Sequence, residues 1–159
     1  MRQCIARRIP TLGICLGGQV IAHALCATVA PADHGHHEFG YHPIYPTAAG
    51  RAYFPNRLFV TQAHYHGFAV PTGADLLATG DVYPHQAFRY GETTFAFQFH
   101  PEVTLAGLKR WQDAPWAPWD QPGAQSRAEQ DALAARHDDA QHRWFTGFLE
   151  TLFGRPERR

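Results

Sequence analysis

The chain has 159 residues and a mass of 17.8 kDa, the size of one domain, and its 45% hydrophobic content suffices for one core. Its 14 basic and 14 acidic residues balance to a formal charge of zero, which gives no electrostatic case for binding nucleic acid or an anionic membrane surface. No apolar run approaches the roughly 20 residues that cross a bilayer, and the first residues do not resemble a secretory signal.

The first predicted elements form a strand followed by a helix. The largely apolar run 9–14 is too short for a helix and is typical of a buried parallel strand. After Gly17 and Gly18 the apolar residues recur at helical spacing, which predicts a helix over about 17–26. A sharp turn around Cys15 would join the two.

The middle of the chain reads as a series of short strands. Turn residues punctuate it at Pro31, Gly35, Gly40, Pro43 and Pro46. Strands are predicted over 42–45, 58–61, 75–79, 86–90 and 93–99. The last two flank Gly91-Glu92 and predict a hairpin, since a tight turn separates two alternating, aromatic-rich runs.

The C-terminal part begins with a loop and ends in a helix. Residues 114–123 contain three prolines and two tryptophans, which predicts a packed loop. Ser126 and Glu129 then fit a capping box, and apolar residues follow at helical spacing as far as Gly154 and Pro156. Residues 1–159 are therefore expected to form a single α/β domain.

The segment around Cys15 has the pattern of a nucleophile elbow, Gly-x-Ser-x-Gly, with cysteine in place of serine. A nucleophile on so sharp a turn adopts a strained backbone, and flanking glycines let strand and helix approach without Cβ clashes. The positive end of the helix favours the reactive thiolate, and the amide of Leu16 would face a developing oxyanion. A structural cysteine in a glycine-rich turn is the alternative.

His100 ends the last predicted strand and is followed, across Pro101, by Glu102. The proline restricts His100 to an extended backbone, which can hold the carboxylate near the imidazole, where it would select the tautomer and stabilise the imidazolium. A thiol needs such a base, and strand ends share one edge of a parallel sheet, so Cys15 and His100 can meet. Taken alone, His100 could be a surface or capping histidine.

Two segments resemble the signatures of class I glutamine amidotransferases: residues 10–19 (PTLGICLGGQ) and 97–102 (FQFHPE). The likeness continues through shorter stretches at 38–41, 61–67, 70–74, 77–79 and 86–89. It is closest to stand-alone relatives of the GMP synthetase glutaminase domain. The resemblance implies a flavodoxin-like, three-layer α/β fold and cofactor-free hydrolysis of the glutamine side-chain amide to glutamate and ammonia.

The resemblance also implies residue roles. Cys15 would form a γ-glutamyl thioester, His100 would act as general base and acid, and Glu102 would orient the imidazole. Leu16 would donate one oxyanion amide. The glutamine pocket would include Gly17, Gln19, His64, Tyr65 and His66. Two structural alternatives stay open, because Gln19 could cap the helix start and His64 could be a hydrogen-bonded sheet histidine.

The sequence departs from the family pattern in two places. Cys26-Ala27 stands where the family commonly has paired glycines, a change expected to cost little. Only eight residues precede Ile9, whereas the family usually places about three strands and a second oxyanion amide there. Losing one oxyanion donor typically costs about 10²–10³ in rate. We therefore expect a domain that lacks its N-terminal strands, hydrolyses glutamine poorly, and is poorly soluble or self-associates through an exposed sheet edge.

Three other interpretations compete. His34, His36 and His37 form a dense cluster that could bind a metal, although no regular ligand spacing accompanies it, and no metal is expected. The chain could be a non-catalytic relative that acts as a binding subunit. The same three residues could also cleave the γ-glutamyl bond of a peptide or conjugate.

The expected partners follow from what the chain contains. No Gly-x-x-x-x-Gly-Lys-Ser/Thr loop occurs, so an ammonia-accepting synthetase would be a separate chain. The loop 114–123 could dock such a partner or pack on its own domain. Cys4, Cys15 and Cys26 form no Cys-x-x-Cys pair, which predicts at least one free thiol and a reducing, cytoplasmic location.

Overall fold

The computed structural model describes residues 1–33 and 35–154. The helices are α1 (Arg2–Ala6), α2 (Leu16–Ala24), α3 (Leu105–Gln112) and α4 (Arg127–Phe153), with a short 3-10 helix η1 (Ala49–Ala52). The strands are β1 (Thr11–Ile14), β2 (Val29–Pro31), β3 (Glu38–Pro46), β4 (Leu58–His64), β5 (His66–Phe68), β6 (Ala74–Gly80), β7 (Ala87–Tyr90) and β8 (Thr94–Phe97).

Six of the strands form one mixed sheet in the order β1-β8-β7-β6-β3-β4. The β1–β8 pair is parallel and pairs Ile14 with Phe97, so the carboxyl ends of these two strands lie side by side. The other neighbours are antiparallel, and β2 pairs with β5 in a separate two-stranded sheet. The parallel first strand and the β7–β8 hairpin are both confirmed.

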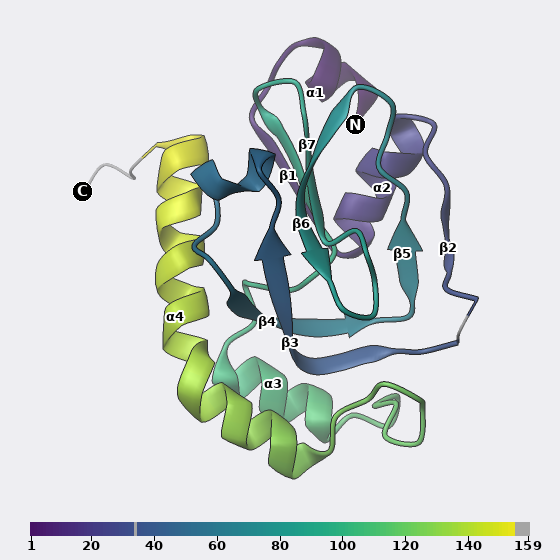
Figure 1. The fold of residues 1–159 in the computed structure, drawn as a ribbon, viewed down its shortest axis with the longest axis vertical. Coiled ribbons are helices and arrows are strands. Elements are labelled where there is room, and N and C mark those ends of the chain that lie inside the picture. Colours follow the sequence, from purple (N-terminus) through teal and green to yellow (C-terminus); the bar gives the residue numbers. More distant parts are fainter. Residues whose placement is uncertain (34, 155–159) are drawn as a thin grey trace.

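Helices cover the sheet on opposite faces because the side chains of β8 alternate. Phe95 and Phe97 pack into the core cluster that contains Phe145 and Phe148 of α4. Ala96, between them, belongs to the cluster that contains residues of α2. Figure 1 shows α4 running along one side of the sheet and α2 lying at the other. This three-layer arrangement places the β1–α2 turn at the edge where β8 ends.

Buried polar contacts tie α4 to the strands beneath it. The Tyr41 hydroxyl donates to Asp138 at 2.7 Å, and burial together with this bond raises the pKa of Tyr41. The Thr61 amide donates to the Gln141 side chain at 2.6 Å. Ser126 and Glu129 form the predicted capping box at the start of the helix. The helix ends before Gly154, as predicted; Pro156 lies outside the described residues.

Several elements were not predicted from the sequence. The strands β2 and β5 have three residues each and pair only with each other, so neither leaves a period-two pattern long enough to detect. The helices α1 and α3 were also missed, although Thr104 caps α3 by accepting from the Gly107 amide. The predicted loop 114–123 carries no helix or strand, and its Trp119 packs edge-on against Phe39 at 5.1 Å.

Cys26 adopts a left-handed backbone with φ of 65°. Non-glycine residues avoid this region because the Cβ crowds the backbone, and holding one there costs on the order of 1–3 kcal/mol. The position therefore requires the backbone that glycine prefers, although the sequence supplies a cysteine. The expectation that this departure costs little does not take this strain into account.

Candidate functional site

Cys15 lies on a strained turn between β1 and α2, with φ of 48° and ψ of −109°. Its amide donates to the Phe97 carbonyl at 2.8 Å, which anchors the turn to the end of β8. A Cβ on Gly13 would clash with the Gly17 backbone, and one on Gly18 would lie 2.6 Å from the Phe97 oxygen. The predicted close approach of strand and helix is confirmed. It depends on Gly13 and Gly18 and not on Gly17, since a Cβ on Gly17 would meet no atom within 4 Å.

His100 follows β8 on the same side of the sheet and is held from two directions. Its amide donates to the Thr61 carbonyl at 2.7 Å, and its ring packs edge-on against Trp111 at 4.9 Å. Its Nδ1 lies 2.7 Å from Glu102 Oε1. Glu102 is thus bonded to the ring across Pro101, in the arrangement that the His-Pro-Glu sequence predicted.

The electrostatics of the site favour a protonated imidazole. Burial lowers the pKa of His100, but hydrogen bonds and charge interactions with Cys15 and Glu102 outweigh it and raise the pKa to about 9. The side chain of His100 is 17% exposed and that of Glu102 is 41% exposed, so the outer half of the pair is hydrated. The structure therefore brings Cys15, His100 and Glu102 together at the carboxyl ends of β1 and β8. This arrangement can hold a thiolate beside an imidazolium.

The remaining residues of the elbow lie at the start of α2. Leu16 and Gly17 are its first two residues, where backbone amides have no earlier helical turn to donate to. Gln19 does not cap the helix. Its Nε2 donates to the His66 carbonyl at 3.2 Å and to Gln98 Oε1 at 3.4 Å. Gln19 is thus within two hydrogen bonds of the sulfur.

The segment 64–66 is only partly directed at the site. His64 is buried, and its Nε2 lies 2.9 Å from Glu38 while its Nδ1 donates to the His66 carbonyl at 2.9 Å. This is the geometry of the alternative in which His64 is a hydrogen-bonded sheet histidine. Tyr65 is 52% exposed and stacks on His37 at 5.0 Å. His66 contacts the site through its backbone carbonyl.

Gln98 was not predicted as a site residue, yet its Nε2 lies 3.9 Å from Cys15 Sγ. The sequence carried one signal for it. A glutamine stands in an aromatic strand, two positions before a histidine, where an apolar residue would suit the core. Trp111, which contacts the His100 ring, lies on α3. Because that helix was not predicted, this contact could not be inferred from the sequence.

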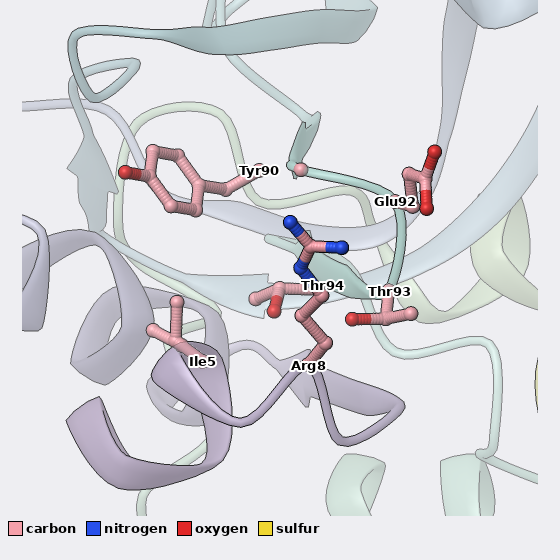
Figure 2. A pocket seen from close by; sticks show the side chains of 7 residues that line it. Ile5, Arg8, Tyr90, Glu92, Thr93 and Thr94 are labelled. Carbon is pink, nitrogen blue, oxygen red and sulfur yellow. The ribbon is translucent and has the colours of Figure 1, made fainter.

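Of two hollows in the surface, one lies beside the elbow and the other lies at the opposite ends of the strands. A groove of about 240 Å³ adjoins the elbow and is lined by Leu16, Gln19, Val20, His23 and Val29. A pocket of about 290 Å³ lies instead at the amino ends of β1 and β8, and Figure 2 shows Arg8 reaching into it between Tyr90 and Glu92. Because Cys15 and His100 lie at the carboxyl ends of those strands, this second pocket is not part of the site.

Neither a metal site nor a membrane span is found in the part of the chain that is described. Within 1–33 and 35–154, no group of three or more His, Cys, Asp or Glu side chains is placed to hold a metal ion. His34, one member of the cluster considered above, lies outside the described residues. No helix in these ranges is both long enough and apolar enough to cross a membrane.

Comparison with known proteins places this chain in a family. The model of the family "Glutamine amidotransferase class-I" matches residues 1–110. The glutamine amidotransferase-like protein YfeJ of Salmonella typhimurium is 32% identical over 114 residues, which cover 69% of this chain and 47% of that protein. The glutamine-hydrolysing GMP synthase of Campylobacter jejuni is 40% identical over 100 residues, which cover 60% of this chain and 19% of the synthase.

A solved structure gives the same result for the fold. The crystal structure of a glutamine amidotransferase from Thermotoga maritima superposes with a TM-score of 0.83 at 29% identity, over 95% of this chain and 65% of that one. The predicted flavodoxin-like α/β fold is confirmed. The chain spans about half the length of YfeJ and about a fifth of the GMP synthase. This chain belongs to the class I glutamine amidotransferase family.

Proposed function

We propose that this protein hydrolyses the side-chain amide of glutamine through a thioester on Cys15. The observation that carries the proposal is the contact of Cys15 and Glu102 with the same imidazole, that of His100. The family membership supports the reaction class, since the similar GMP synthase is named as glutamine-hydrolysing. A thiolate beside an imidazolium is the state from which acyl transfer begins.

The reaction proceeds in two halves. The Cys15 thiolate attacks the amide carbon, and the carbonyl oxygen takes up the charge, facing the Leu16 amide. His100 gives its proton to the departing nitrogen, so that ammonia leaves and a γ-glutamyl thioester remains. His100 then removes a proton from water, the resulting hydroxide attacks the thioester, and glutamate leaves as the Cys15 thiolate is restored beside the protonated His100; the proton of the new carboxyl group passes to solvent. Glu102 holds the ring in one tautomer and stabilises its charged form.

The ammonia is proposed to be consumed by a synthetase. GMP synthase carries both activities in one longer protein, of which this chain matches about a fifth. The groove beside Leu16 and Gln19 adjoins the elbow and is a candidate route by which substrate could reach the nucleophile. Gln19 and the His66 carbonyl are the pocket candidates that hydrogen bonds connect to the sulfur, through Gln98.

The test is glutamine turnover with matched cysteine variants. Cys15→Ser should abolish release of glutamate and ammonia, whereas Cys26→Ser, which changes an exposed cysteine, should retain it. A glutamine-like diazoketone should label Cys15 alone, as detected by peptide mass spectrometry. The γ-glutamyl anilide of an aromatic amine, assayed in parallel, reports whether larger leaving groups are accepted. Equal loss of activity in both cysteine variants, or labelling spread over all three cysteines, would refute the assignment.

A further inference from the structure

Gln98 is a fully buried polar residue at the end of β8, with an exposed fraction of 0%. A buried side-chain amide needs hydrogen-bond partners, since leaving it unsatisfied costs about 1–3 kcal/mol. Its partners lie in the site. Oε1 accepts from Gln19 Nε2 at 3.4 Å, and Nε2 donates to Cys15 Sγ at 3.9 Å. The Gln98 backbone amide donates to the Gln86 carbonyl at 2.8 Å and fixes the residue's place in the sheet.

The direction of these bonds follows from one backbone group. The His66 carbonyl can only accept, so the Gln19 atom that faces it at 3.2 Å must be the amide nitrogen. The same nitrogen faces Gln98, whose facing atom must therefore be its oxygen. The nitrogen of Gln98 is consequently the atom directed at the sulfur. The orientation of both amides is thus set by the His66 carbonyl, and flipping either would place two like groups against each other.

We propose that Gln98 is a positioning residue that donates a hydrogen bond to the Cys15 sulfur and favours its thiolate form. A thiolate accepts hydrogen bonds and has none to donate, so an N–H directed at it stabilises the charged state more than the neutral one. The inference rests on the proposed role of Cys15 as nucleophile. The sulfur then lies between two groups from the end of β8, the amide of Gln98 and the ring of His100.

Gln98 also links the nucleophile to the glutamine-pocket candidates. The chain of bonds runs from the His66 carbonyl through Gln19 and Gln98 to Cys15. Loss of Gln19 should therefore leave Gln98 in place but free to rotate. Loss of Gln19 should therefore disfavour the Cys15 thiolate, as loss of Gln98 does, but by a smaller amount.

The experiment measures the rate of Cys15 alkylation by iodoacetamide against pH, without glutamine. Peptide mass spectrometry separates Cys15 from Cys4 and Cys26. Gln98→Met should move the pH of half-maximal reaction upward by about one unit, which is a roughly ten-fold loss of rate at pH values below both midpoints. Gln98→Glu keeps the volume but brings a carboxylate to the sulfur, so it should shift the profile further.

Gln130→Met is the matched control, because Gln130 is also 0% exposed and its side-chain amide also donates hydrogen bonds, to the Phe39 and Gln125 carbonyls. It should lower stability and leave the alkylation profile unchanged. Adding Gln19→Leu to Gln98→Met should cause no further shift, since both act through one bond. A wild-type profile in both Gln98 variants would overturn this inference alone. If wild-type Cys15 reacts no faster than Cys26, the proposed function fails as well.

Discussion

Replacing Glu102 by glutamine is the sharpest test of how the site is charged. The variant keeps an oxygen that can accept from His100 Nδ1 and removes the negative charge 2.7 Å away. The pKa of His100 is about 9 against an ordinary 6.5, a difference that corresponds to about 3 kcal/mol of imidazolium stabilisation. Cys15 shares in that stabilisation, and Glu102 is 41% exposed and screened by water. We therefore expect the substitution to lower the pKa by about one unit, or ~1.4 kcal/mol.

The assay is an NMR titration of the His100 ring in the wild type and in Glu102→Gln. The midpoint should fall from about 9 to about 8. Glutamine turnover should fall in parallel, since the imidazole loses its charged orienting partner. An unchanged His100 midpoint would show that Glu102 does not act on the ring, and the proposed role of Glu102 would be wrong.

The same pair predicts how stability depends on pH. Because the folded pKa of His100 lies above its ordinary value, the pair's contribution is fully present below about pH 6.5 and is lost as pH rises through about 9. The wild type should therefore exceed Glu102→Gln in free energy of unfolding by ~1 kcal/mol at pH 6, and the two should converge near pH 10. Urea denaturation at these two pH values measures the difference. A gap that persisted or widened at high pH would contradict the sign.

Three substitutions test the fold around the site. Gly18→Ala should lower the free energy of unfolding in urea by about 1–3 kcal/mol, because its Cβ would lie 2.6 Å from a carbonyl oxygen of β8. Gly17→Ala is the control and should be neutral or stabilising, because a Cβ there meets open space. Equal losses in the two variants would contradict this prediction. Tyr41→Phe removes the 2.7 Å bond to buried Asp138 and should cost about 1–3 kcal/mol in thermal unfolding, with a loss near zero counting against the bond. Ser126→Ala breaks the capping box and should lower stability by about 1 kcal/mol by circular dichroism, and no change would mean that the cap is dispensable.

The parts of the fold that could be predicted are those with local signals. The β7–β8 hairpin follows from alternating aromatic residues around Gly91, and the capping box at Ser126 follows from two residues three positions apart. The strand β3 was predicted with bounds that are too short, since it was predicted over 42–45 and extends over Glu38–Pro46. Its additional residues pair with β4, and such pairing is non-local.

The candidate site was predictable in its motifs and not in its supporting contacts. Cys15, His100 and Glu102 stand in short patterns whose chemistry can be read directly from the residues. The position of Gln98 beside the sulfur depends on the register of β1 with β8, which no single segment determines. The buried side chain of His64 is held by a hydrogen bond with Glu38, which lies 26 positions earlier in the chain.

The hydrogen bonds of Thr61 connect the C-terminal helix to the candidate site. Its amide is held by Gln141 of α4, and its carbonyl holds the amide of His100. A shift of α4 along its axis would therefore be transmitted through Thr61 to the His100 backbone, without any substitution at Cys15, His100 or Glu102. Gln141 lies beyond residue 110, outside the segment that the family model matches. A change at Gln141 is therefore expected to reach the His100 backbone through Thr61 alone, from the side of the sheet that α4 covers.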